Sequence, residues 1–204
     1  MRPGPARGLR WLVASGAAAL LLAGLAASPD ESFAAPQRRI EKTRTRLVRH
    51  LTERRGLLHV ATFDEPVPAD FVSGRPFVFS GTVAGPGRFG LARKFDGRER
   101  TQIEIPVRWD KIGAAFTLSF WANVAPGRSN QCIWYRAAEG AQVGFHLEDG
   151  RMTFDLPAAA GRQTVSYPFA RYGTFVHLAA TVDAGAGRMA LYEDGRRMAE
   201  GPVQ

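Results

Sequence analysis

Apolar and polar residues alternate with the two-residue period of β-strands through most of the chain after residue 57. The clearest run is Phe116–Val124, FTLSFWANV, in which every second residue is apolar. Because successive side chains of a strand point to opposite faces, this pattern predicts a strand with one face in a core.

Two Asp-Gly pairs, Asp149-Gly150 and Asp194-Gly195, each lie between two alternating runs. This is the strongest short-range signal for a β-hairpin. The strands predicted besides Phe116–Val124 are Leu57–Glu65, Leu91–Phe95, Thr101–Pro106, Gln131–Arg136, Val143–Glu148, Arg151–Leu156, Thr164–Tyr167, Phe175–Asp183, Arg188–Glu193 and Arg196–Glu200.

The segment between the first two predicted strands, residues 70–90, is rich in Gly, Pro and Phe and reads as a long loop with short strand pieces. No stretch after residue 57 has the period of a helix. Many short strands at this spacing predict an all-β protein, an antiparallel sandwich or barrel.

The first 28 residues have the pattern of a secretory signal. Three arginines precede an uncharged apolar run, Trp11–Ala27, which small residues follow. We therefore expect residues 1–28 to be a signal peptide and the protein to be exported, to the periplasm, the cell surface or the medium. The alternative is a membrane anchor formed by residues 11–27, although the cations that follow this run oppose that topology.

Residues 37–55 contain neither Gly nor Pro and place four apolar residues on one helical face. They predict a short basic helix within a stem, residues 29–56, that precedes the folded part at 57–204. The helix is either a solvated stem or a contact with an anionic membrane surface. The cations that would make such a contact are Arg38, Arg39, Lys42, Arg44, Arg46 and Arg49.

The net charge of +8 belongs to the leader and stem. Residues 1–56 hold 11 Lys and Arg against 4 Asp and Glu, whereas residues 57–204 hold 16 against 15. A nearly neutral domain argues against a nucleic-acid partner. Cys132, the single cysteine, excludes an intrachain disulfide, and the four histidines lack the spacing of a metal site.

Three passages resemble the concanavalin A-like lectin/glucanase superfamily, and within it the laminin-G-like jelly rolls. They are LARKFDG followed by TQIEIP, then FTLSFWANV, then FVHLAATVDAGAGRMALYEDG at Phe175–Gly195. The resemblance covers about residues 57–200 and implies an antiparallel jelly-roll β-sandwich. Phe175 stands where these domains usually carry Trp.

Members of this group usually continue into one more strand, which pairs beside the first. We therefore expect residues 57–204 to lack their last strand and to leave Leu57–Glu65 as an open edge. Either the chain is a fragment or a truncated gene product, or the basic stem or another subunit covers that edge.

The resemblance also implies which chemistry to look for. Glucanases of this fold carry two carboxylates at alternate positions of one strand, and no such run occurs here. We therefore predict no catalytic residues and no enzymatic activity. Some relatives bind calcium through loop carboxylates. Asp96, Asp149 and Asp183 are the loop candidates, although turn chemistry explains each of them.

A group of aromatic and amide residues follows the Pro126-Gly127 turn, and such side chains commonly form sugar platforms. The candidate ligand-binding residues are Asn130, Gln131, Trp134, Tyr135 and Arg136. Because neighbouring residues of a strand alternate, at least one of the two aromatic residues should face the core instead.

The sequence thus predicts a non-catalytic exported module that recognises a glycan or an extracellular or periplasmic protein surface. The alternative is a structural or assembly module whose open sheet edge is completed by a partner strand. A divergent glycoside hydrolase is a third alternative.

Overall fold

In the computed structural model of the chain, the residues described are 11–14, 43, 45–53, 56–64, 68–97, 101–104, 112–127, 130–138, 141–158 and 161–203. For residues 11–14, 135–138, 141, 142 and 158 only the backbone is described. The strands are β1 (Trp11–Ala14), β2 (Val78–Ser80), β3 (Val83–Pro86), β4 (Leu91–Lys94), β5 (Gln102–Glu104), β6 (Ala115–Val124), β7 (Asn130–Ala138), β8 (Ala141–Glu148), β9 (Arg151–Ala158), β10 (Gly161–Pro168), β11 (Phe175–Asp183), β12 (Arg188–Glu193) and β13 (Arg196–Pro202). A helix covers residues 45–53.

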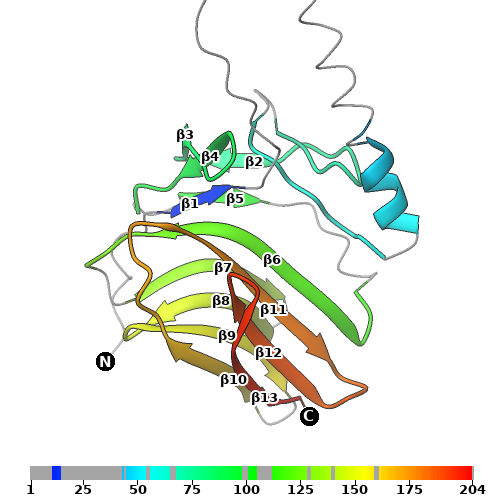
Figure 1. Ribbon diagram of the computed structural model, residues 1–204, viewed down its shortest axis with the longest axis vertical. Helices are drawn as coiled ribbons and strands as arrows, with labels where there is room; N and C mark the ends of the chain where they lie inside the picture. The colour runs from blue at the N-terminus through cyan, green and yellow to red at the C-terminus, as the bar shows by residue number, and fades with distance from the viewer. Residues whose placement is uncertain are drawn as a thin grey trace, which may run out of the picture.

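Two antiparallel sheets make the sandwich. The larger sheet has the order β13-β12-β11-β6-β1-β4-β3, and the smaller has the order β10-β9-β8-β7. Strands β2 and β5 form a separate two-stranded ladder. Figure 1 shows β6 and β11–β13 in one layer over β7–β10, with β1–β5 and the helix at the upper end. The predicted all-β antiparallel sandwich is confirmed.

The core lies between the two layers, and the alternation seen in the sequence accounts for it. Phe145 on β8 and Phe154 on β9 are fully buried, with ring centroids 5.0 Å apart. Phe120 on β6 packs edge-on against Phe145 at 5.1 Å, which joins the two sheets. Leu178 on β11 and Leu191 on β12 are likewise fully buried. Such side chains each contribute about 1.5–3 kcal/mol by leaving water.

Both predicted Asp-Gly hairpins are confirmed, between β8 and β9 and between β12 and β13. Asp149 and Gly150 have φ values of 49° and 75°, and Asp194 and Gly195 have values of 48° and 79°. Two successive positive φ angles define the type I′ turn, whose twist matches that of the strands it joins. Asp tolerates this conformation and Gly adopts it freely.

Strand β1 comes from the segment predicted as a signal peptide. Its residues Trp11–Ala14 pair antiparallel with Val124–Trp121 of β6, and Leu12 and Val13 pair antiparallel with Lys94 and Arg93 of β4. In this structure β1 therefore joins β6 to the β3–β4 hairpin. Signal function, cleavage and the missing last strand remain predictions. The rest of residues 1–28 lies outside the described residues.

The predicted strand at Leu57–Glu65 is wrong for residues 57–64, none of which is in a strand. The backbone groups of this segment are bonded elsewhere: Leu57 N–H to the Leu51 carbonyl, and the Val60 carbonyl to Phe71 N–H. Val60 N–H donates to the Asp70 carboxylate. These local bonds take the place of a strand ladder.

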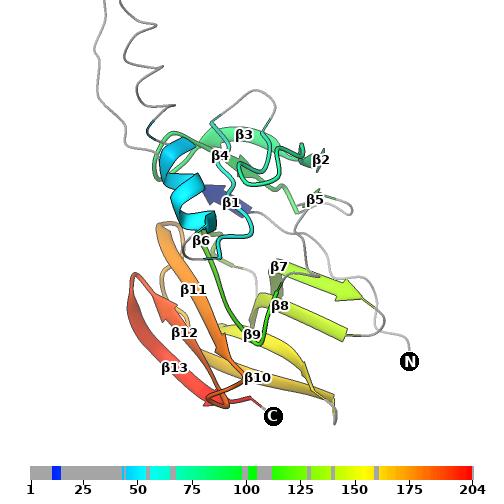
Figure 2. The same cartoon turned by 90° about the vertical axis from the view of Figure 1, so that its right-hand side faces the viewer.

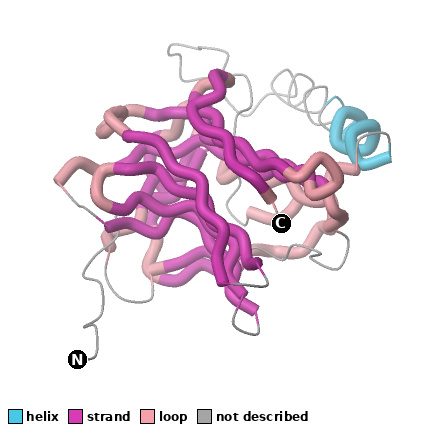
Figure 3. Tube along the Cα trace, turned by 90° about the horizontal axis from the view of Figure 1, so that it is seen from below, coloured by secondary structure: helices cyan, strands magenta, loops and turns pink. Residues whose placement is uncertain are grey.

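The helix at residues 45–53 agrees with the predicted stem helix over the part that is described, while residues 37–42, 44, 54 and 55 lie outside it. Figures 1 and 2 place this helix at the same end of the molecule as β2–β5, and Figure 3 shows it at the rim of the packed strands. In the part of the chain that is described, no helix has the length and apolar character needed to cross a membrane.

Candidate functional site

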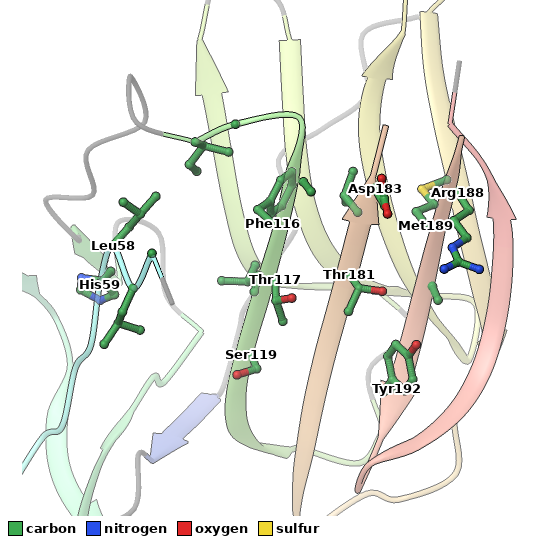
Figure 4. A pocket seen from close by; sticks show the side chains of 18 of the residues that line it. Leu58, His59, Phe116, Thr117, Ser119, Thr181, Asp183, Arg188, Met189 and Tyr192 are labelled. Carbon is green, nitrogen blue, oxygen red and sulfur yellow. The ribbon is translucent and has the colours of Figure 1, made fainter. Parts of the chain in front are cut away.

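An open cleft of about 930 Å³ lies along the first half of β6 and is here called the β6 cleft. Leu58 and His59 lie on the side of the cleft opposite Phe116, Thr117 and Ser119 of β6 (Figure 4). The neighbouring strands β11 and β12 and the edge strand β13 extend the cleft away from β6. It therefore has three walls of different character.

The polar wall is the outer face of the large sheet. Thr117 is opposite Thr181 in the register of β6 and β11, and Ser119 is opposite the small Ala179. Tyr192 on β12 is opposite Ala179 from the other side. The wall consists of Thr117, Ser119, Thr181, Asp183, Arg188, Ala190, Tyr192, Arg197 and Glu200. Small side chains beside a single half-buried aromatic ring leave a shallow polar surface with hydroxyl donors and acceptors.

The apolar wall reaches into the edge of the sandwich. Phe116 and Leu118 of β6 and Trp134 of β7 pack against the core, but they are only partly buried. All three line the β6 cleft. At the cleft, therefore, side chains that pack against the core remain partly exposed, whereas elsewhere the two sheets bury the core.

The loop wall is the segment Gly56–His59 together with Ile112 and Leu51. The carboxylate of Asp70, only 1% exposed, fixes this segment. Its Oδ1 accepts hydrogen bonds from the backbone N–H of Val60 at 3.0 Å and of Val72 at 3.1 Å. Its Oδ2 accepts from Ser73 N–H at 2.9 Å and from the Ser73 hydroxyl.

Two opposed effects set the pKa of Asp70. Burial alone would raise it, but the hydrogen bonds from Ser73, Val60 and Val72 outweigh burial, so the pKa lies below its ordinary value. Nδ1 of His59 is 3.1 Å from Oδ1 of Asp70. Burial lowers the pKa of His59 by more than the Asp70 carboxylate raises it. At neutral pH the loop wall therefore carries a charged Asp70 and an uncharged His59.

The acidic residues of the cleft have structural partners. Asp183 Oδ1 accepts the backbone N–H of Ala186 at 2.9 Å, which closes the turn after β11. Glu200 forms an ion pair with Arg197 on the same strand. Asp183 on β11 and Glu200 on β13 are separated by strand β12 and are offset by two residues along the strands. At ordinary strand spacing and rise, their Cα atoms are about 12 Å apart. Among the described residues, no group of three or more His, Cys, Asp or Glu is arranged to hold a metal ion.

Of the five residues proposed from the sequence, three have described side chains, and of these three Trp134 alone lines the β6 cleft. Asn130 is exposed at the start of β7, and its Oδ1 accepts the backbone N–H of Asp149 at 3.4 Å. Gln131 is 2% exposed and donates to the Ala125 carbonyl at 3.1 Å. Trp134 packs on the core, as expected for one of the two aromatic residues, and also lines the cleft.

Tyr135 and Arg136 belong to β7, opposite Gly144 and Val143, and their side chains lie outside the described residues. The cleft residues on β6, β11 and β12 were missed as a site. Their sequence signal is weak, because Thr and Ser at outward positions occur on the solvent face of any sheet.

Two of the three residues considered for calcium lie in described turns. Asp149 has the positive φ of the hairpin corner, and Asp183 caps its turn as described above. The third, Asp96, accepts the Thr101 hydroxyl at Oδ1 over 2.9 Å.

A second polar cluster lies on the outer face of the small sheet. Asp155, 4% exposed, accepts the Thr164 hydroxyl at 2.7 Å and lies 3.1 Å from Arg162 Nη1. His146 approaches it with Nδ1 at 3.4 Å, and its Nε2 is 3.3 Å from Glu148. Since these side chains are bonded to one another, they tie β8, β9 and β10 together across the sheet surface.

The sequence and the structure were compared with known proteins. A search of curated proteins gives no match. The fold is similar to the crystal structure of the binding domain of Paraclostridial Mosquitocidal Protein 1, with a TM-score of 0.58 and 16% identity over 72% of this chain. The match spans 39% of that protein's chain. The family described as "Concanavalin A-like lectin/glucanases superfamily" matches residues 96–204, more than half of the chain. With its confirmed antiparallel sandwich, the chain belongs to the concanavalin A-like lectin/glucanases superfamily.

Proposed function

We propose that this protein is a non-catalytic, exported binding module that recognises a glycan or a protein surface through the β6 cleft. The observation that carries the proposal is the open cleft itself, which joins a polar sheet face to a partly buried apolar wall. Sites that combine apolar surface with a few placed polar groups are typical of ligand binding. The family and the similar toxin binding domain agree with this class of function.

Two features of the cleft support recognition of a ligand. Tyr192 offers a flat ring on the same face of the sheet as the hydroxyls of Ser119 and Thr181, which suits stacking against a sugar face. Phe116 and Trp134 offer apolar surface, which suits contact with a protein. The bonds that Asp183 and Glu200 already make within the fold support a non-catalytic role, since a glycosidase needs two carboxyl groups that are available for the reaction.

Export rests on the signal pattern of residues 1–28. Cleavage of the signal near residue 28 would change the fold, because it would remove β1. Residues Trp121–Val124 of β6 would then lose their partner on that side, and the open edge would extend along all of β6. N-terminal sequencing of the protein recovered from outside the cytoplasm should begin near residue 28. An intact N-terminus on that protein would contradict cleavage.

The binding proposal is tested with a blocking substitution and a matched control. Ser119 and Ser80 are both exposed serines in strands, but only Ser119 lines the cleft. The full chain, Ser119→Trp and Ser80→Trp are applied to arrays of oligosaccharides and of peptides. We expect binding to at least one class, weakened about tenfold or more by Ser119→Trp, a loss of roughly 1.4 kcal/mol.

Ser80→Trp should bind like the unmodified chain. Equal loss in both variants, or no binding to either array, would contradict the site. Any oligosaccharide that binds should be recovered at full length, and shortened products would contradict the non-catalytic role.

A further inference from the structure

We propose that the occupant of the β6 cleft is a partner polypeptide in extended conformation, which adds to the large sheet as a strand along Ala115–Phe120. This inference rests on the proposed function and names the partner for the same site. It follows from the hydrogen-bond register of β6, from the burial of its side chains and from continuity with the β1–β6 ladder.

Strand β6 pairs with β11 along nine of its ten residues and with β1 along only four. Residues Ala115–Asn123 are in register with β11, whereas β1 pairs only with Trp121–Val124. Among the described residues, Ala115–Phe120 therefore have a strand partner on the β11 side alone. Every second residue of this half directs its N–H and C=O towards the cleft. Such a row of unpaired groups is a template for strand addition.

Side-chain burial changes at the same point of the strand. Ala122 and Val124, next to β1, face the core and are 0% exposed. Phe116, Leu118 and Phe120 face the same core from the same strand but are only partly buried. Since strand and face are the same, the difference reflects the missing neighbour. A strand laid beside Ala115–Phe120 would cover these three side chains, and the apolar area removed from water would favour its binding.

The geometry of the β1–β6 ladder also defines the partner. A strand that continues this ladder runs antiparallel to β6 and spans about six residues. Its side chains alternate between the side of Phe116 and Leu118 and the side of Thr117 and Ser119. The partner should therefore carry apolar residues at alternate positions and small polar residues between them. A polypeptide meets the backbone groups of β6 with regularly spaced amides, which a glycan does not have.

Disulfide trapping tests this placement, with a matched control that the register supplies. Thr117 and Thr181 are register partners on the same face, but β6 separates Thr181 from the open edge. Residues opposite each other on adjacent strands have Cβ atoms about 4.5–5.5 Å apart, while the next strand is about 4.8 Å further away. A disulfide bridges only the nearer pair.

The probe is an eight-residue peptide of alternating Val and Thr with one cysteine, supplied as the mixed disulfide with thionitrobenzoate. The full chain carries Thr117→Cys or Thr181→Cys. The rate of peptide attachment is divided by the rate at which a small thiol reagent labels the same variant. With cysteine at a Thr position of the peptide, we expect attachment to Thr117→Cys to be about tenfold faster than to Thr181→Cys, because strand addition raises the local concentration.

Moving the cysteine to a Val position of the peptide should remove this advantage, since the side chain then points to the other face. Equal attachment rates in the two variants would overturn the inference. So would an attachment rate to Thr117→Cys that is the same for both positions of the cysteine in the peptide. If an oligosaccharide still binds and is blocked by Ser119→Trp, the cleft remains a binding site with a glycan as its ligand. If neither the register-dependent peptide attachment nor oligosaccharide binding is observed, the proposed function is overturned as well.

Discussion

Asp70 is the residue on which the loop wall of the cleft depends, and its replacement gives a sharp test of the structure. Oδ1 accepts two backbone N–H groups, from Val60 and Val72, while Oδ2 accepts both donors of Ser73. Asp70→Asn preserves the shape and one oxygen, but it places an amide donor where Ser73 presents donors. Ser73→Ala removes only the hydroxyl bond.

The expected magnitudes follow from this count. A hydrogen bond to a charged group contributes about 1.5–3 kcal/mol, and a buried donor left without an acceptor costs about 1–3 kcal/mol. Asp70→Asn should therefore lower the free energy of unfolding by about 2–4 kcal/mol, and Ser73→Ala, which removes one bond from an exposed serine, by about 1.5 kcal/mol. At a urea dependence of about 2 kcal/mol/M, the Asn variant should shift the unfolding midpoint by about 1–2 M.

Urea unfolding followed by tryptophan fluorescence measures both variants. A midpoint shift for Asp70→Asn no larger than that for Ser73→Ala would refute the four-bond arrangement at Asp70. Hydrogen exchange localises the effect, because loss of the carboxylate should expose the amide of Val60 first.

Three further predictions concern the core, the cysteine and the pH dependence. Phe145→Ala, at a fully buried position between two other phenylalanine rings, should cost about 3–5 kcal/mol in urea unfolding, while Val78→Ala, 59% exposed, should stay within about 0.5 kcal/mol; similar losses would contradict the core assignment. Burial raises the pKa of Cys132 to about 12, so a thiol reagent at pH 8 should label the native protein far more slowly than the urea-unfolded protein; equal rates would mean an accessible thiolate. Burial lowers the pKa of His59 below its ordinary value of about 6.5, so the unfolded chain binds the proton more readily, and the free energy of unfolding should fall as the pH drops below about 6.5. His59→Gln should remove that step from the stability profile, and an unchanged profile would contradict its assignment to His59.

Local signals predicted the strands well where neighbouring segments pair with each other. The alternation in Phe175–Asp183 and the Asp-Gly turns fixed β8–β9 and β11–β13, because those partners are close in the chain. The segment Leu57–Glu65 has the same alternation but no strand in its described part. Its Val60 N–H donates to the side chain of Asp70, ten residues further along the chain, instead of to a neighbouring strand. The alternation of apolar and polar residues gives no information about such a competing hydrogen bond.

The candidate site depends on contacts that are distant in sequence, and this limited its prediction. Aromatic density identified Asn130–Arg136, of which Trp134 reaches the cleft. The cleft itself arises where β6 lacks a neighbour, a property of strand order and register. The expectation of an incomplete sheet named Leu57–Glu65 as the open edge, whereas residues 57–64 form no strand and, among the described residues, Ala115–Phe120 of β6 lack a neighbour on one side.

The state of that edge is the central claim, and single-residue amide exchange in the full chain tests it most directly. Within Ala115–Phe120, we predict alternation: amides directed towards β11 exchange slowly, and amides directed towards the cleft exchange fast. Within Trp121–Val124, where β1 completes the ladder, the amides directed towards β1 should be protected as well. Addition of a strand-forming peptide should slow the fast set alone. Uniform slow exchange from Ala115 to Phe120 in the unliganded chain would show that the edge is already paired and would contradict the account.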